Sequence, residues 1–422
     1  MRPSFRFPAA VFALLAASPA LAAPKSPADV AAAALKAAPV WDGHNDVPEQ
    51  LRDRYKDVIA TFDFTDTTRT ADPARSRIAM HTDLTRLRAG KVGAQFWSVF
   101  VSPALTDQQA VQAVMEQIDV TRRLIAKYPA DLQFADNAAG VEQAWKAGRI
   151  ASLLGMEGGY AIGNSPGVLR QFRALGVRYM TLAHFRSTSW ADSATDAPRN
   201  NGLSPFGKDI VREMQRIGML VDLSHVSTRT MLDALGAARA PVIFSHSGAR
   251  AVDDHARNVP DEVLARVKDN GGIVMVVSLP AYVSQKARDW TVARTAEKAR
   301  LEARWSEAPD TATAAMADWE KAHPAPRATL SDLADHIDHV VKVAGIDHVG
   351  LGGDFDGMAE ATEGFDDVAH YPALFVELAR RGYVQADLEK IASRNLMRVL
   401  KAADAYAAAH AADPALETPT AF

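Results

Sequence analysis

Seven histidine, aspartate and glutamate residues each follow or end an apolar segment of the sequence. The segments read VWDGHND, SLLGMEGG, YMTLAHF, MLVDLSH, VIFSH and VGLGGDFDG, and the residues are His44, Asp46, Glu157, His184, His225, His246 and Asp354. Imidazole and carboxylate groups in one site are ligands that suit zinc and similar divalent cations. A cation held in this way can lower the pKa of a bound water and supply a nucleophile without serine or cysteine.

The spacing of these residues suggests which of them could share a cation. His44 and Asp46 are two residues apart, so both side chains can point from the same face of a strand. His225 and His246 end two consecutive segments and can hold a second cation. Glu157 has two oxygens, and one carboxylate can bridge two cations. Such a centre keeps a small positive charge, which favours an anionic group on the substrate.

For these seven residues to share one site, the strands that carry them must end at the same edge of a sheet or barrel. Parallel strands need crossover connections, and alternating strand-like and helical segments predict an α/β fold with a parallel sheet. Eight such units predict closure into a (β/α)₈ TIM-type barrel, whose active site lies at the carboxyl ends of the strands. The expected strands are 39–44, 92–100, 150–156, 177–184, 218–225, 241–246, 272–279 and 348–354.

Helical patterns fill the intervals between the strands. Residues 107–127 have apolar side chains at helical spacing. Another helix is marked at its start by Ser204 and Pro205 and at its end by Gly218.

A charged, helix-prone stretch at 284–326 is too long for a loop after the seventh strand and predicts a helical insertion. Two interpretations of the insertion are open: a lid or oligomer contact over the C-terminal face, or a solvated helical hairpin. We expect the barrel domain to span residues 24–404, and residues 405–422 to form a loosely held C-terminal tail.

The N-terminus predicts a cleaved signal peptide over residues 1–23. Arg2 and Arg6 flank the start of a short apolar stretch, and Ala20-Leu21-Ala22 fits the rule for cleavage after Ala22 or Ala23. The apolar part is too short to span a bilayer, so we expect an exported, periplasmic protein without a stable membrane anchor. The chain has no cysteine, which excludes disulfides and a lipid anchor on an N-terminal cysteine. A net charge of −4 gives no basic face for nucleic acid.

Four other titratable residues are predicted to take no part in metal binding or catalysis. His336 and His339 belong to an amphipathic helical pattern, DLADHIDHVVKVAG, away from the strand ends. Asp222 is out of step with the alternation of its strand, which predicts that it faces the helices. His255 lies in a loop and is assigned no task.

At these motifs the sequence resembles the membrane (renal-type) dipeptidase family of zinc peptidases, a branch of the amidohydrolase-type barrels. The resemblance runs from about residue 40 to about residue 400, and it rests on DGHNDVP, GAQFWSVF, GMEGG, RYMTLAHF, WADS, NGLSPFGKDIVREMQRIGMLVDLSHVS, APVIFSHS, RNVPD and HVGLGGDFDG. It implies a (β/α)₈ barrel with a binuclear zinc site that hydrolyses dipeptides through a hydroxide bridging the metals. It also implies that a homodimer is a common state.

The resemblance implies that five residues hold two zinc ions. In the family pattern, the histidine and aspartate of DGHND bind the first zinc ion, here His44 and Asp46. The histidines of the DLSHVS and FSHS stretches bind the second, here His225 and His246. The glutamate of MEGG bridges both ions, here Glu157.

Other positions carry implied roles in catalysis and substrate binding. His184 would polarise the scissile carbonyl, Arg257 would bind the substrate carboxylate, and Asp354 would be the proton shuttle. Asp354 could instead be a third metal ligand or a hydrogen-bond partner of a ligand histidine, although Asp356 is the better candidate for that partner. The family's aromatic residue after the seventh strand is absent here, where Leu279 stands, and Tyr282 could take its place from the loop. This departure leaves the substrate preference open.

The resulting hypothesis is a binuclear zinc dipeptidase for which an L-Xaa-D-Xaa dipeptide is one expected substrate. Another amidohydrolase-type hydrolase, such as an N-acyl-amino-acid deacylase, a lactonase or a phosphotriesterase, is the alternative within enzymes. Many of those barrels have His-x-His on the first strand and a carboxylated lysine bridge, whereas this chain has HND and Glu157. A non-catalytic binding protein on a barrel scaffold is the alternative outside enzymes, and the presence of His44, Glu157 and Asp354 argues against it.

Overall fold

The computed structural model describes residues 3–4, 25–75 and 77–418. The predicted signal peptide lies almost entirely outside these residues. Among the helices in the described part of the chain, none is long and apolar enough to cross a membrane.

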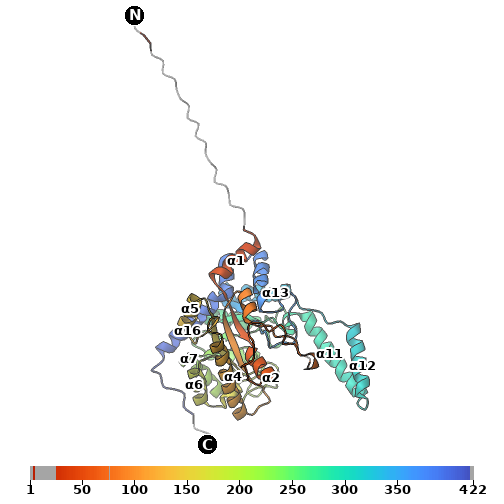
Figure 1. Ribbon diagram of the computed structural model, residues 1–422. Helices are drawn as coiled ribbons and strands as arrows, with labels where there is room; N and C mark the ends of the chain where they lie inside the picture. Colours follow the sequence, from red (N-terminus) through yellow and green to blue (C-terminus); the bar gives the residue numbers. More distant parts are fainter. Residues whose placement is uncertain (1–2, 5–24, 76, 419–422) are drawn as a thin grey trace.

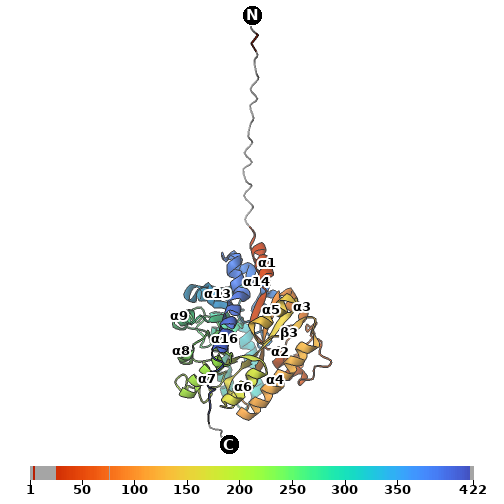
Figure 2. The ribbon, with the colours of Figure 1, turned by 90° about the vertical axis from the view of Figure 1, so that its left-hand side faces the viewer.

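Parallel strands close into a barrel at the centre of the molecule, with helices around it (Figure 1 and Figure 2). Eight strands follow the order β2-β1-β9-β8-β7-β6-β5-β4, and β4 pairs back with β2, so the predicted (β/α)₈ barrel is confirmed. The strands are β1 (Val40–Asn45), β2 (Val92–Phe100), β3 (Leu132–Phe134), β4 (Ile150–Glu157), β5 (Val177–Thr181), β6 (Leu220–Asp222), β7 (Ile243–Phe244), β8 (Ile273–Val276) and β9 (Val349–Leu351).

The short strand β3 was not predicted. It pairs in parallel with the first residues of β4, and β5 pairs with the last residues of the same strand. With only three residues, β3 carries too little pattern to be recognised from sequence.

Several strands are shorter than their apolar segments. Pairing in β5, β6, β7 and β9 stops two or three residues before the site residue that ends each segment. These site residues are His184, His225, His246 and Asp354, in that order. The apolar character continues past the last paired residue because the connecting segments are also buried. Four of the site residues therefore sit on short loops just beyond the sheet, whereas His44 and Glu157 lie within strands.

Sixteen α-helices are present in the described part of the chain. Most of them cover the outside of the barrel, and α1 packs against α14 and α15. The helices are α1 (Pro27–Ala37), α2 (Val47–Tyr55), α3 (Leu84–Ala89), α4 (Asp107–Lys127), α5 (Ala138–Lys146), α6 (Pro166–Ala174), α7 (Pro205–Arg216), α8 (Thr228–Ala237), α9 (Asp261–Asn270), α10 (Pro280–Val283), α11 (Gln285–Arg304), α12 (Pro309–Ala322), α13 (Leu330–Ala344), α14 (Tyr371–Arg380), α15 (Gln385–Glu389) and α16 (Asn395–Ala409).

Apolar and aromatic side chains fill the inside of the barrel. This inner core combines strand residues with one face of α16, so that helix covers one end of the barrel. The core residues include Trp41, Phe96, Leu153, Tyr179, Leu220, Ile243, Ile273, Met275, Leu396, Met397 and Leu400. With one end packed, the carboxyl ends of the strands are left to form the site.

The predicted insertion after the seventh barrel strand is helical. It consists of the short α10 followed by α11 and α12, which run side by side away from the barrel (Figure 1). Leu301, Ala312 and Met316 form a small core between the two helices, separate from the barrel cores. The hairpin thus stabilises itself and is held to the barrel at its base.

We expected residues 405–422 to form a loosely held tail, but the described part of this segment is partly helical and bonded to the barrel domain. Helix α16 continues to Ala409, five residues past the expected domain boundary. Beyond it, the backbone N–H of Leu416 donates to Glu213 and its carbonyl accepts from Arg170. These bonds tie the end of the described chain to α6 and α7.

Candidate metal centre and active site

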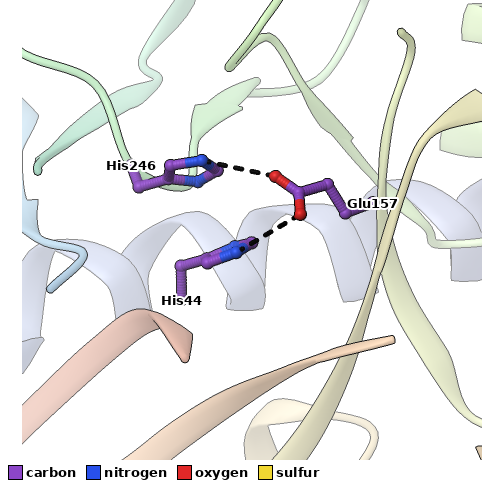
Figure 3. A group of neighbouring side chains, drawn as sticks. All are labelled: His44, Glu157 and His246. Carbon is purple, nitrogen blue, oxygen red and sulfur yellow. Dashed lines mark ion pairs between the residues drawn. The ribbon is translucent and has the colours of Figure 1, made fainter. Parts of the chain in front are cut away.

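The carboxylate of Glu157 lies at the centre of a buried group of histidines and acids. Glu157 is the last residue of β4, and its two oxygens face different sides of the site. Oε2 lies 3.6 Å from Nε2 of His44, and Oε1 lies 3.3 Å from Nε2 of His246 (Figure 3). One carboxylate therefore faces two sets of possible ligands, which adjoin where the rings of His44 and His246 pack 3.9 Å apart.

His44, Asp46 and Asp354 gather on the Oε2 side of Glu157. His44 lies in β1 and Asp46 directly follows it, whereas Asp354 follows β9, the barrel neighbour of β1. Nε2 of His44 is 3.3 Å from Oδ2 of Asp46 and 4.0 Å from Oδ1 of Asp354. The structure thus brings together the acid and imidazole groups that the sequence assigned to the first metal, with Asp354 beside them.

Three histidines gather on the Oε1 side. Nε2 of His225 lies 2.9 Å from Oε1 of Glu157, and Nε2 of His184 lies 3.8 Å from the same oxygen. The Nε2 atoms of His225 and His246 are 2.9 Å apart. The seven residues predicted for the metals, for polarisation of the carbonyl and for the proton transfer therefore meet in one place at the barrel rim.

The acidic side of the cluster, around His44, Asp46 and Asp354, is suited to hold positive charge. Burial lowers the pKa of His44, but the carboxylates of Asp46 and Glu157 outweigh this effect and raise it to about 10. Burial, together with the charge of Asp46, raises the pKa of Asp354 to about 7. A high affinity for protons at buried, crowded acids indicates a site where a bound cation would be stabilised.

Unpartnered atoms point to the same conclusion. Oδ1 of Asp46, Nδ1 of His184 and Nδ1 of His225 are buried without a hydrogen-bond partner in the described part of the chain. Oε1 of Glu157 also makes no hydrogen bond of good geometry there, although Nε2 of His225 lies 2.9 Å away. Burial of a carboxylate oxygen without a partner is costly, and coordination of a cation removes that cost. The mixed nitrogen and oxygen donors fit a divalent metal such as zinc.

The loops that carry the site adopt unusual backbone conformations. His225, Asp354 and Asp356 have φ angles of 67°, 61° and 68°, in the left-handed region that such residues rarely occupy. Gly357 lies so close to Asp46 and Asp354 that a side chain there would collide with both carboxylates. Strained backbone of this kind is characteristic of functional sites.

Arg257 lies beside the histidines, fully buried. Its Nη2 donates to the carbonyl of His246 at 3.1 Å and its Nη1 donates to Ser247 at 3.2 Å, whereas Nε has no partner in the described residues. The ring of Tyr282, in α10, lies 5.3 Å from the Arg257 guanidinium. His255, which was assigned no task, packs on Tyr282 and accepts the backbone N–H of Arg257.

Sequence reasoning missed the residues that orient two of the predicted ligand histidines. Nδ1 of His44 is 2.8 Å from the hydroxyl of Tyr179, and Nδ1 of His246 is 2.9 Å from Oγ of Ser245. Ser245 in turn donates to Asp222 at 2.6 Å. A serine directly before the histidine in the FSHS stretch was the only sequence signal for this support.

Two predictions about acidic residues are wrong. Asp222 does not face the helices but lies behind His246, because strand pairing ends at Asp222 and the alternation does not continue to His225. Asp356 is not the partner of a ligand histidine. It accepts the backbone N–H of His81 at 2.8 Å, and Tyr179 and Ser245 occupy the role expected of it.

The structure adds a carboxylate that the sequence analysis did not single out. Glu49 is in the first turn of α2, half-buried and three residues after Asp46. Burial, together with the charges of Asp46 and Asp53, raises the pKa of Glu49 to about 9. By contrast, His336 and His339 lie in α13 and bind Ala249, Val283 and Asp261, outside the cluster, as predicted.

Comparison with known proteins gives a consistent family. Residues 28–414 match the model of the membrane dipeptidase family, peptidase family M19. A protein of Schizosaccharomyces pombe described as an uncharacterized dipeptidase is 41% identical over 377 residues, covering 86% of this chain and 80% of that protein.

Solved structures share the fold. The probable dipeptidase PvdM from Pseudomonas aeruginosa has a TM-score of 0.76 at 24% identity, covering 90% of this chain and 99% of that one. A metallopeptidase from Rhodobacter sphaeroides, liganded with a phosphinate mimic of the dipeptide L-Ala-D-Ala, has a TM-score of 0.69 at 22% identity, covering 87% and 99%. The chain belongs to the membrane dipeptidase family and is a metallo-dipeptidase of peptidase family M19.

Proposed function

We propose that the chain is a binuclear zinc dipeptidase that accepts dipeptides with a D-residue in the second position. The observation that carries this proposal is the position of Glu157, whose Oε2 faces His44 and whose Oε1 faces His225 and His246. His44 and Asp46 would hold one zinc ion, His225 and His246 would hold the other, and Glu157 would bridge them. The dipeptide mimic bound by the Rhodobacter sphaeroides relative supports the substrate class.

Bound zinc ions would supply a water of lowered pKa as the nucleophile and would offset the charge that develops on the scissile carbonyl. His184, whose Nε2 lies 3.8 Å from Oε1 of Glu157, would donate to that carbonyl oxygen. Asp354 would accept the proton of the attacking water and pass it to the departing amine. In the chain without metal, burial and the charge of Asp46 raise the pKa of Asp354 to about 7, so this carboxyl takes up a proton more readily than an exposed aspartate.

Arg257 would set the length of the substrate. Its guanidinium is buried and lies 5.3 Å from the ring of Tyr282, and its Nε has no partner among the described residues, so it can bind a carboxylate. The free amine of a dipeptide would then lie on the side of Asp46 and Asp354. A longer peptide or a blocked terminus would lose one of these two contacts.

A comparison of substrates tests this arrangement. The zinc-loaded enzyme is expected to cleave a dipeptide but not the matching tripeptide, the N-acetylated dipeptide or the dipeptide amide. Replacing Arg257 by methionine is expected to lower kcat/KM for the free dipeptide by ~100-fold, since a charge-assisted pair is lost from a buried site. Arg327→Met, at an exposed arginine, is the control. Equal turnover of all four compounds by the unmodified enzyme would defeat the proposal.

We also propose that the protein is exported and that the signal peptide is removed. The basis is the sequence of residues 1–23 described above. N-terminal sequencing of protein recovered from the periplasm is expected to begin at Ala23 or Pro24, and a cytoplasmic protein that begins at Met1 would contradict this.

A further inference from the structure

A buried chain of hydrogen bonds lies directly behind His246. Asp222, the last residue of β6, has one carboxylate oxygen, Oδ2, that accepts from Ser245 Oγ at 2.6 Å and from Thr181 Oγ1 at 2.5 Å. Ser245 Oγ is also 2.9 Å from Nδ1 of His246. Asp222 and Ser245 are completely buried, so water does not compete for these contacts.

The chemistry of these groups fixes where each hydrogen lies. A serine hydroxyl has one hydrogen to donate, and an ionised carboxylate only accepts. Ser245 therefore gives its hydrogen to Asp222, and its oxygen is left to accept from Nδ1 of His246. A neutral imidazole with its hydrogen on Nδ1 has a lone pair on Nε2. That Nε2 atom is the one that faces Glu157, at 3.3 Å.

We propose that Asp222 and Ser245 are positioning residues that fix the tautomer of His246, so that its Nε2 lone pair is available to a cation. The consequence for metal binding rests on the metal centre proposed above. The tautomer itself is a property of the metal-free chain, so it can be tested separately from that proposal.

The surroundings of Asp222 make asparagine an informative replacement. The other carboxylate oxygen, Oδ1, accepts the backbone N–H groups of Ser224 at 3.1 Å and Ser245 at 2.8 Å. In Asp222→Asn these two donors would hold the amide oxygen in that place, so the NH₂ group would take the position of Oδ2. The amide would then donate to Ser245 Oγ.

With its oxygen occupied in this way, Ser245 would turn its hydrogen to another acceptor. Nδ1 of His246, at 2.9 Å, is nearer than Oγ of Ser224, at 3.4 Å. His246 would then carry its hydrogen on Nε2, and the lone pair needed by a cation would be lost. Asp222→Asn thus enforces the wrong tautomer, whereas Ser245→Ala removes only the preference for the right one.

The experiment compares the wild type, Asp222→Asn, Ser245→Ala and the double variant. The tautomer of His246 is read from ¹⁵N chemical shifts of metal-free protein labelled at histidine, and zinc affinity is measured by competition with a chelator. We expect the Nδ1–H form in the wild type and the Nε2–H form in Asp222→Asn. Zinc affinity should fall by ~10–100-fold in Asp222→Asn and by less in Ser245→Ala.

The double variant separates positioning from simple loss of structure. Without Ser245, the amide introduced by Asp222→Asn has no hydroxyl to turn, so the double variant should bind zinc more tightly than Asp222→Asn alone. A purely structural role for these residues predicts the opposite order. An Nδ1–H tautomer in Asp222→Asn, or a double variant weaker than that single variant, would overturn the inference. Failure of the wild type to bind zinc would instead overturn the proposed metal centre.

Discussion

At the scale of single residues, the site depends on side chains of ordinary chemistry placed in an unusual environment. Glu157 divides its oxygens between two sets of ligands, and burial raises the pKa of Asp354 to about 7. Arg257 is buried beside the histidines and not on the surface. An aspartate exposed to water would be ionised at neutral pH, with a pKa of about 4.

Replacing Asp354 by asparagine removes the proposed proton carrier while keeping its size. We expect kcat to fall by ~100–10,000-fold with little change in KM, because proton transfer matters in the transition state and not in substrate binding. Asp356→Asn is the matched control, since Asp356 lies on the same strained loop but binds His81. Steady-state kinetics of both zinc-loaded variants measures the effect, and an Asp354→Asn enzyme that keeps its kcat would exclude the assigned role.

The candidate ligands and catalytic residues could be predicted from the sequence, but the residues that hold them through hydrogen bonds could not. His44, Glu157 and His225 were recognisable because charged or imidazole groups at the ends of apolar segments are unusual. Tyr179 and Ser245 resemble ordinary core and strand-end residues, and only their hydrogen bonds to His44 and His246 reveal their position. Residue type indicates what a group can do, whereas its partners depend on contacts between distant strands.

At the scale of elements, the barrel could be predicted from the sequence, but the residues at which individual strands end could not. The eight barrel strands were located by apolar segments, and the closing contact is the pairing of β2 with β4. The prediction for Asp222 failed because strand alternation applies only while the backbone stays in the sheet, and pairing in β6 stops at that residue. Where the chain leaves a strand early, the alternation of side chains no longer predicts which way each residue points.

His336 connects three elements and makes folding sensitive to acid. Its Nδ1 accepts the backbone N–H of Ala249 at 2.8 Å, and its Nε2 then donates to the carbonyl of Val283 at 2.9 Å. Burial lowers the pKa of His336 from 6.5 to about 4. The unfolded chain takes up this proton below pH 6.5, whereas the folded chain resists it, so stability is lost as the pH falls through this range.

The expected loss from His336 is about 2 kcal/mol between pH 7 and pH 4.5. In His336→Gln this part of the pH dependence should disappear, whatever the variant's stability at pH 7. Urea unfolding at both pH values measures the difference between the two proteins. Equal losses of unfolding free energy in the wild type and the variant would show that His336 is not responsible.

The helical hairpin should be removable without loss of the barrel. Arg294 and Glu320 form an ion pair of 2.6 Å across the two helices, and the hairpin core beyond them is separate. Replacing residues 295–319 by a short glycine–serine turn is expected to change Tm by less than ~3 °C. Thermal unfolding followed by circular dichroism tests this, and a variant that does not fold would show that the hairpin supports the barrel.

At the scale of the whole molecule, one end of the barrel is packed and the other is reserved for chemistry. Helix α16 joins the inner core through Leu396, Met397 and Leu400. The opposite end carries every residue to which we assign a part in hydrolysis. This division allows the buried carboxylates and histidines to gather at one end of the barrel. The packed remainder of the barrel offsets the cost of the strained loops that carry His225 and Asp354.

The most direct test of this account is the number of zinc ions bound per chain, measured together with dipeptide turnover in one preparation. Metal-free protein would receive zinc in steps, with bound metal measured by mass spectrometry and hydrolysis measured with L-Ala-D-Ala. The account predicts that binding and turnover both saturate at two zinc ions per chain. Undiminished hydrolysis by protein without bound metal, or saturation at a single ion, would contradict it.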